Sequence, residues 1–248
     1  MGVQAILLDK DGTLIDFNGT WGPAAYEVMR ILSAGDGARL EALVAVSEYI
    51  ESERRFLPTS PLVAGSAAEY GPLWAQALGR EAGQAFYDVV DELFREWGLH
   101  FLAPIHEPAA VAAALKRRGF RLGIATNDAE RSAQDQAQAL GLAPHLDFIA
   151  GYDSGFGGKP HPGMVLGFAE SCGIAPDAVA LVGDSLHDLH AARAAGAVAV
   201  AVLTGPMKEA ARPELEPFAD YVIGSIADLP ALAEILRAKA SPSRKPIS

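Results

Sequence analysis

Cysteine is nearly absent from this chain: Cys172 is the single cysteine among 248 residues. A lone thiol excludes an internal disulfide framework and is typical of proteins from a reducing compartment.

The sequence also lacks a long uncharged apolar run. The apolar segment Ala5–Leu8 is interrupted at once by Asp9, so we expect no signal peptide, and no uncharged stretch is as long as a membrane span. Gly2 does not indicate myristoylation, because Ile6 stands where that motif has Ser or Thr. We therefore predict a cytoplasmic protein without membrane contacts, while the sequence leaves the oligomeric state open.

Basic residues are scarce, with 20 Lys and Arg against 31 Asp and Glu and a formal net charge of −11. Nucleic-acid backbones are bound by clustered Lys and Arg, so a nucleic-acid partner is not expected. A small anionic substrate would need a local positive site. A metal ion, one lysine and backbone N–H groups at helix N-termini can provide one.

Several common ligand-binding motifs are missing as well. Lys159 follows Gly158, but Asp153 stands where a Walker loop has its first glycine, and Pro160 replaces its Ser or Thr. No dinucleotide fingerprint follows the first predicted strand, and the six histidines show no zinc-site spacing.

Half of the residues are apolar, which is ample for a buried core, and their spacing changes along the chain. Helical periodicity dominates residues 16–104, with a clear amphipathic stripe over 86–97 and weaker ones over 26–32, 40–50 and 70–78. From residue 105 strands and helices alternate, which is typical of parallel βαβ units. We expect strands near 121–125, 147–150, 178–182, 198–203 and 221–223, and a last helix over 226–238.

This pattern predicts an α/β fold, a Rossmann-like doubly wound parallel sheet with an inserted α-helical bundle. The predicted core comprises residues 1–15 and 105–238, the inserted helical domain residues 16–104, and a flexible tail residues 239–248.

Polar residues occur where the predicted strands end. The first strand runs into Asp9 and Asp11, a later one into Thr126 and Asn127, and another into Asp184. Lys159 lies in a loop after a further strand. A parallel sheet places all its carboxyl ends at one edge, so we expect these side chains to converge. Taken singly, each has an ordinary alternative as a turn residue, a helix cap or a solvated lysine.

Four short motifs resemble, in chain order, those of the haloacid dehalogenase-like superfamily of phosphohydrolases: Asp9-Lys10-Asp11-Gly12-Thr13, Thr126-Asn127, Gly158-Lys159-Pro160 and Gly183-Asp184-Ser185-Leu186-His187-Asp188. The ordered set is specific, although the second motif alone is weak. The continuation through residues 191–196 and 204–206 resembles the phosphoglycolate phosphatase-like branch, and the helical insertion is similar to the cap of that branch. Asp11 is shared with the phosphatases and mutases of the superfamily, not with its dehalogenases.

The resemblance implies a role for each acidic residue. Asp9 would attack phosphorus and form an aspartyl-phosphate, and Asp11 would act as the general acid and base. Mg²⁺ would be bound by Asp9, Asp184 and the backbone carbonyl of Asp11, an oxygen-only set that suits this cation. Asp188 would support the metal site from one helical turn beyond Asp184.

The same resemblance implies that Thr126, Lys159 and backbone N–H groups, including that of Asn127, bind the phosphoryl oxygens. Lys10 replaces a commoner apolar residue, and we assign no role to its side chain. Arg54 and Arg55 in the helical insertion are candidates for substrate specificity, with a surface salt bridge as the alternative. Phe17, Asn18 and Trp21 are candidates for lining the entrance, although a core position is favoured for Trp21.

The predicted function is Mg²⁺-dependent hydrolysis of a small phosphomonoester, phosphoglycolate-like or a sugar phosphate. One alternative is a phosphomutase of the same superfamily, similar to β-phosphoglucomutase, which returns the phosphoryl group to a sugar. The other is a non-catalytic ligand-binding or interaction module. The sequence does not specify which phosphorylated metabolite is the substrate.

Overall fold

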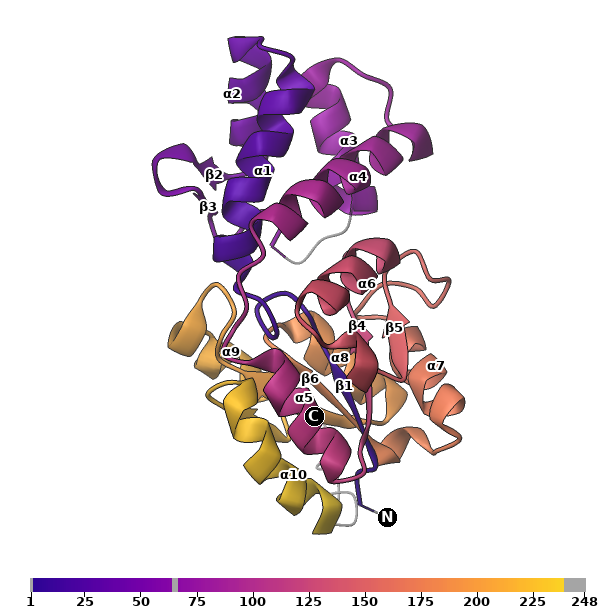
Figure 1. The fold of residues 1–248 in the computed structure, drawn as a ribbon. Coiled ribbons are helices and arrows are strands. Elements are labelled where there is room, and N and C mark those ends of the chain that lie inside the picture. The colour runs from indigo at the N-terminus through magenta and orange to yellow at the C-terminus, as the bar shows by residue number, and fades with distance from the viewer. Residues whose placement is uncertain (1, 64–66, 239–248) are drawn as a thin grey trace.

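A six-stranded sheet forms the centre of the molecule in the computed structural model, which describes residues 2–63 and 67–238 (Figure 1). All neighbouring strands are parallel, in the order β5-β4-β1-β6-β7-β8. The strands are β1 (Ala5–Leu8), β4 (Arg121–Ala125), β5 (Phe148–Ala150), β6 (Val179–Gly183), β7 (Val198–Val202) and β8 (Tyr221–Ile223). The predicted fold class is therefore confirmed, and each predicted strand lies within one residue of an observed one.

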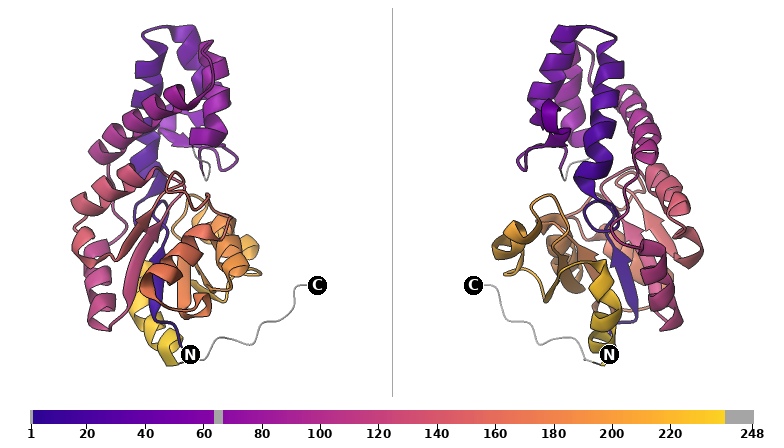
Figure 2. Two further views of the ribbon diagram at one scale, coloured as in Figure 1. Left: turned by 90° about the vertical axis from the view of Figure 1, so that its right-hand side faces the viewer. Right: turned by 60° about the vertical axis from the view of Figure 1, so that its left-hand side comes forward.

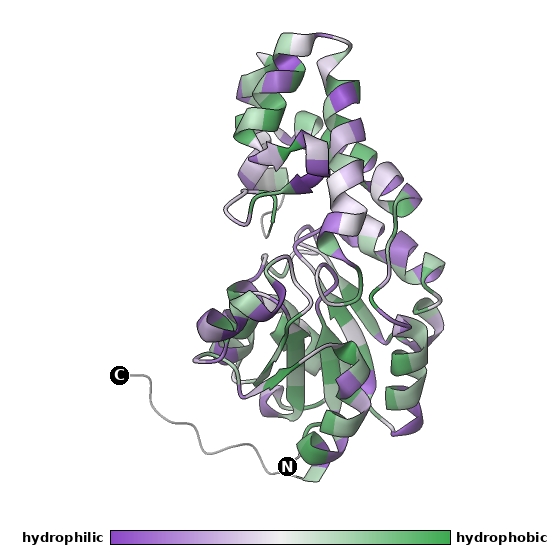
Figure 3. Cartoon of the chain, turned by 90° about the vertical axis from the view of Figure 1, so that its left-hand side faces the viewer, coloured by the Kyte–Doolittle hydropathy of each residue, from purple (hydrophilic) through white to green (hydrophobic). Residues whose placement is uncertain are grey.

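Helices cover both faces of this sheet. Along β1, Ile6 and Leu8 pack with α5 (Pro108–Arg117), α6 (Glu130–Ala139) and α10 (Leu229–Ala238), while Ala5 and Leu7 pack with α7 (Gly163–Cys172) and α8 (Leu186–Ala195). All four residues of β1 are buried, as expected for a parallel strand covered on both sides. Figure 3 shows the strands almost entirely in hydrophobic colours. The last predicted helix begins with a 3₁₀ turn at Ile226–Asp228, and α9 (Arg212–Leu215) is a single short turn.

The segment from residue 16 to 104 is mainly helical, as its periodicity predicts. It contains α1 (Phe17–Ser33), α2 (Gly37–Val46), α3 (Ala67–Leu78) and α4 (Gln84–His100). Between α2 and α3 lies a short antiparallel hairpin that the sequence pattern did not predict, β2 (Tyr49–Ile50) with β3 (Arg55–Phe56). Strands of two residues are too short to show the period of two by which strands are predicted.

Aromatic side chains hold these helices together. Trp74 on α3 is fully buried, its ring centroid lies 5.6 Å from that of Phe94 on α4, and its indole N–H donates to the Ser47 hydroxyl at 2.9 Å. Burying an indole with its polar group satisfied avoids the cost of an unpaired donor. These aromatic side chains belong to the same buried apolar cluster as Ile6 and Leu8 on one face of the sheet.

The chain enters and leaves the helical segment through two backbone segments that lie side by side. Ile15 bridges Pro104, the Asp16 N–H donates to Ala103 O at 2.8 Å, and the Ile105 N–H donates to Leu14 O at 2.9 Å. Figure 2 shows the helices beyond the sheet edge at which β1 ends. The division into a core, an inserted domain and a tail stays a prediction, and the predicted tail at 239–248 lies outside the described residues.

Within the described ranges, no helix combines the length and the apolar character needed to cross a bilayer.

Candidate active site

The carboxyl ends of β4, β1 and β6 are neighbours in the sheet, and the residues that follow them line one cavity. Asp9 follows β1, Thr126 follows β4, and Asp184 follows β6. Lys159 reaches the same place from the loop after β5. The structure therefore brings together the side chains that the strand ends predicted, at the edge where open parallel sheets bind ligands.

Lys159 lies at the floor of the cavity between two carboxylates. Its Nζ is 2.5 Å from Asp9 Oδ1 and 2.6 Å from Asp188 Oδ1, and it donates to Ala125 O at 2.8 Å. Burial alone would lower the pKa of Lys159, but Asp188 and Asp9 outweigh burial and raise the pKa. The lysine therefore stays protonated.

The surroundings of Asp9 and Asp184 disfavour the charged form of each carboxyl group. Burial raises the pKa of Asp9, and Asp188 and Asp11 add to the rise while Lys159 opposes it. Burial also raises the pKa of Asp184 well above its usual value, with further contributions from Asp9 and Asp188. Like charges in a buried site are stabilised by a cation, so this cluster is short of positive charge.

The donor set suits a hard divalent cation. Carboxylate oxygens of Asp9, Asp184 and Asp188 lie within 4.8 Å of one another. Glycine at positions 12 and 205 leaves space for the Asp184 carboxyl group. A methyl group at either position would overlap that carboxyl group. Oxygen-only carboxylate sites of this kind fit Mg²⁺. The Asp188 carboxylate lies within this cluster, paired with Lys159 and Ser185. Its support of the metal site stays a prediction, as do the ligand roles of Asp9, Asp11 and Asp184.

Asp11 is fixed by donors from three different segments. One carboxylate oxygen accepts from Lys10 Nζ at 2.8 Å and from the indole N–H of Trp21 on α1, and the other accepts from the Thr126 hydroxyl at 3.2 Å. The Asp11 carboxyl is about one-fifth exposed and lines the cavity beside Asp9. Its position therefore depends on the turn, on the sheet and on the helical segment.

The Lys10 side chain is a component that the sequence reasoning missed. It is 1% exposed, its Nζ lies 3.0 Å from Asp128 Oδ2 in addition to its bond with Asp11, and it sits 4.7 Å from the centre of the Trp21 ring. Burial would lower the pKa of Lys10, but Asp11 and Asp128 outweigh it and raise the pKa. The motif alone does not show that the Lys10 side chain points toward Asp11 and not toward solvent.

Asn127 holds the loop that carries Lys159. Its amide N–H donates to Lys159 O at 2.9 Å, and its amide oxygen accepts from the Lys159 N–H at 2.8 Å. This two-way contact fixes the backbone of the lysine. Asp188 has a similar second task, because it forms a capping box with Ser185 at the start of α8.

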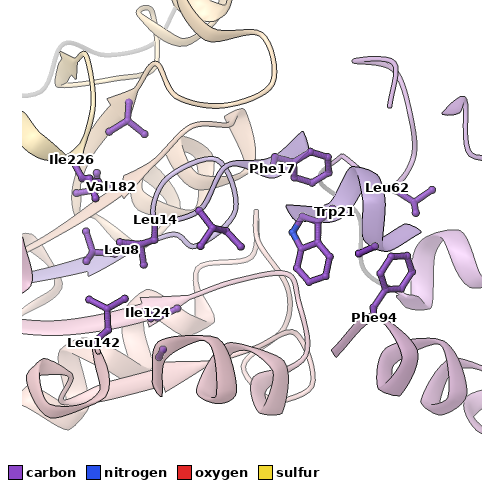
Figure 4. Packing of buried hydrophobic residues seen from close by; sticks show 14 of the residues in the cluster. Leu8, Leu14, Phe17, Trp21, Leu62, Phe94, Ile124, Leu142, Val182 and Ile226 are labelled. Carbon is purple, nitrogen blue, oxygen red and sulfur yellow. The ribbon is translucent and has the colours of Figure 1, made fainter. Parts of the chain in front are cut away.

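The cavity extends from this cluster into the helical segment and is open to solvent. Phe17 and Trp21 line it, so Trp21 is both a packing residue and a wall of the site. Figure 4 shows Phe17, Trp21, Leu62 and Phe94 gathered where the helices meet the sheet. Tyr152 and Asp91, which the sequence analysis did not single out, also line the cavity.

Arg54 and Arg55 are not among the side chains that line this cavity. The Arg54 guanidinium lies over the Tyr26 ring at 4.9 Å, and Arg55 pairs with Glu53 at 2.6 Å. Their part in specificity stays a prediction, and the alternative of a surface salt bridge describes the observed contact of Arg55.

A parallel sheet with a buried acidic and lysine cluster at its carboxyl edge, roofed by a helical insertion, defines a class of α/β enzymes. The model of the haloacid dehalogenase-like hydrolases matches residues 3–196. The chain belongs to this family, which confirms the predicted resemblance, and it is therefore a hydrolase.

Similar proteins agree with this assignment. The chain is 31% identical over 235 residues to a phosphoglycolate phosphatase of Neisseria meningitidis, covering 92% of each, and 29% identical over 230 residues to one of Thiobacillus denitrificans, covering 91% of this chain and 93% of the relative. A phosphonoacetaldehyde hydrolase-like protein from Oleispira antarctica shares the fold at a TM-score of 0.70 and 18% identity, over 99% of this chain and 96% of that one.

Proposed function

We propose that this chain is a Mg²⁺-dependent phosphatase that hydrolyses a small phosphomonoester through an aspartyl-phosphate on Asp9. The class, a phosphatase of the haloacid dehalogenase-like family, follows from the family match and from relatives named for that activity. The metal and the intermediate are supported by one observation above the others: Asp9, Asp11, Lys159 and Asp184 line a single cavity.

The first half of the reaction transfers the phosphoryl group to the enzyme. An Asp9 carboxylate oxygen forms a bond to phosphorus while the bond from phosphorus to the leaving oxygen breaks. Asp11, held by Lys10, Trp21 and Thr126, gives its proton to that leaving oxygen. The alcohol then departs into the part of the cavity formed by the helices.

The second half releases phosphate. Water attacks the same phosphorus, Asp11 takes its proton, and the bond between phosphorus and the Asp9 oxygen breaks. The Lys159 ammonium, 2.5 Å from Asp9 Oδ1, is placed to balance negative charge on the transferred group. Asp9, Asp184 and the backbone carbonyl of Asp11 would hold Mg²⁺, with Asp188 beside them, and the ion when bound would supply the positive charge that this cluster lacks.

We further propose that residues 16–104 act as a cap. Trp21 links α1 directly to Asp11, and Phe56, Tyr70 and Phe94 from the helical segment line the cavity. Such a cap excludes bulk water during transfer and contacts the leaving group.

A phosphate-release screen tests this function. Purified protein is assayed with Mg²⁺ against an aryl phosphate and a panel of small phosphorylated metabolites that includes 2-phosphoglycolate and sugar phosphates. Free phosphate is the expected product. Interconversion of sugar phosphates without phosphate release would instead identify a mutase, and no reaction with any compound would contradict catalysis.

A further inference from the structure

The half of the cavity that lies within the helical segment has a distinct composition. Its lining is aromatic and aliphatic, and Trp21 connects it to the acidic cluster, since the indole N–H contacts Asp11 while the ring lies 5.9 Å from Phe94. Tyr70 continues this wall, with its ring 6.2 Å from Phe94. The apolar and aromatic members are Phe17, Trp21, Phe56, Leu62, Val63, Ala67, Tyr70 and Phe94.

One formal charge from the helical segment enters this wall, the carboxyl group of Asp91 on α4. It accepts a hydrogen bond from the Tyr152 hydroxyl at 2.6 Å. Burial, with smaller contributions from Asp128, Asp153 and Asp88, raises the pKa of Asp91 to about 6 against the effect of that bond. The surroundings of Asp91 are therefore negative and contain no compensating partner charge among these contacts.

The cations near the cavity are already paired or lie in its other half. Lys10 lies over the Trp21 ring but does not line the cavity, and it pairs with Asp11 and Asp128. Among the described lining residues, the basic side chains are Lys159, which pairs with Asp9 and Asp188, and His187 at the start of α8. Arg54 and Arg55 are not among these lining residues. A carboxylate on the leaving group would thus lie near the Asp91 carboxylate, with no cation beside it to balance the negative charge.

We propose that the leaving alcohol of the natural substrate carries a protonated amine, so that the substrate is a phosphorylated amino alcohol. Aromatic faces together with one carboxylate are the surroundings that bind organic cations, and the same carboxylate repels an acid. The phosphoryl group lies at Asp9 and the ammonium group lies near Asp91 against the aromatic wall. This inference rests on the proposed phosphatase activity, and it separates the chain from relatives named for phosphoglycolate, a carboxylate substrate.

Three phosphomonoesters of similar size and different charge test it: O-phosphoethanolamine, ethyl phosphate and 2-phosphoglycolate, assayed for kcat/KM with Mg²⁺. We expect the amine to exceed the carboxylate by at least about tenfold, the effect of about 1.4 kcal/mol in differential binding. An aryl phosphate is assayed in parallel. Turnover of the aryl ester with a preference for 2-phosphoglycolate would overturn the inference and leave the phosphatase activity standing.

Asp91→Asn keeps the size of the side chain and an oxygen for Tyr152 while removing the charge. The ratio of kcat/KM for O-phosphoethanolamine to that for ethyl phosphate should fall about tenfold in this variant. Glu96→Gln, at an exposed position on the same helix, is the matched control and should keep the wild-type ratio. An unchanged ratio in Asp91→Asn contradicts the proposal.

A binding measurement does not depend on turnover. Calorimetry on Asp9→Asn with Mg²⁺ compares O-phosphoethanolamine with 2-phosphoglycolate, and tighter binding of the amine is expected. Equal or tighter binding of the carboxylate would overturn the inference even if no substrate were hydrolysed.

Discussion

Lys10 shows how one side chain can hold an acidic site together. It is buried between Asp11 and Asp128 and lies over the Trp21 ring, so it balances two carboxylates that would otherwise repel each other. Removing one partner of a buried ion pair leaves an uncompensated charge, which costs more than the pair contributes.

Lys10→Met should therefore lower the free energy of unfolding by about 2 kcal/mol, a value reduced from that of fully buried pairs because both carboxylates are partly exposed. Urea unfolding measures the change. Adding Asp128→Asn removes one of the two stranded charges and should recover about half of the loss. A Lys10→Met protein as stable as the wild type would show that the contact is electrostatically neutral.

Asp91 gives a pH dependence whose sign follows from its burial. Its pKa is raised from 3.8 to about 6 in the folded protein, so the folded state binds the proton more tightly than the unfolded state does. The stabilisation is fully present below about pH 4 and is lost as the pH rises to about 6.

Asp91→Asn should therefore gain stability relative to the wild type between pH 4 and about 6, with no further change above that range. Thermal unfolding of both proteins across this range measures the difference. A difference in unfolding free energy that stays constant with pH would contradict the assigned pKa of Asp91.

At the scale of elements, helix α1 is joined to the turn that carries Asp11 by the Trp21 side chain. The indole donates to Asp11 while its ring packs on Phe94, so the position of the helix and the position of the acid are coupled. A displaced general acid lowers the rate of proton transfer more than it lowers substrate affinity.

Trp21→Phe keeps an aromatic ring and removes the donor. We expect kcat to fall about tenfold with a smaller change in KM, which corresponds to about 1.4 kcal/mol in the barrier. Trp74→Phe is the matched control, because it loses a comparable bond, to Ser47, away from the cavity. Equal effects of the two substitutions on kcat would refute the coupling.

The sheet elements and the convergence at their ends could be predicted because both follow from local rules. Buried strands read as apolar runs, and parallel strands end at one edge, so Asp9, Thr126 and Asp184 were found without coordinates. The directions of Lys10 and Trp21 depend on a turn and on the docking of a helix. Neither the turn nor the docking of the helix produces a periodic pattern in the sequence.

The pairing of Asp91 with Tyr152 was beyond prediction for a related reason. The two residues are separated by 61 positions and come from the helical segment and from the loop after β5. Their contact is set by how the helices sit on the sheet, which the pattern of either segment alone does not contain. Arg54 and Arg55 are specificity candidates by residue type alone. In the fold, Arg54 contacts the Tyr26 ring and Arg55 pairs with Glu53.

At the scale of the whole molecule, we expect the crowded carboxylates to make stability depend on a bound divalent cation. A ligand that binds the folded state alone stabilises it by about 2.7 kcal/mol at a concentration about a hundred times its Kd. Mg²⁺ should therefore raise the Tm of the wild type above that measured in a chelator.

Asp184→Asn separates the two electrostatic contributions. Removing the Asp184 carboxylate, whose pKa is raised by burial and by Asp9 and Asp188, should raise the Tm in the chelator, while the response to Mg²⁺ is lost. A variant that keeps the full Mg²⁺ response in differential scanning calorimetry would exclude Asp184 as a ligand.

The central claim is that Asp9 carries the phosphoryl group, and phosphate release from an aryl phosphate by Asp9→Asn tests it most directly. With Mg²⁺ present and folding verified by thermal unfolding, the variant should retain less than about one-thousandth of the wild-type kcat, as expected for loss of a nucleophile. Wild-type turnover by a folded Asp9→Asn protein would contradict the account.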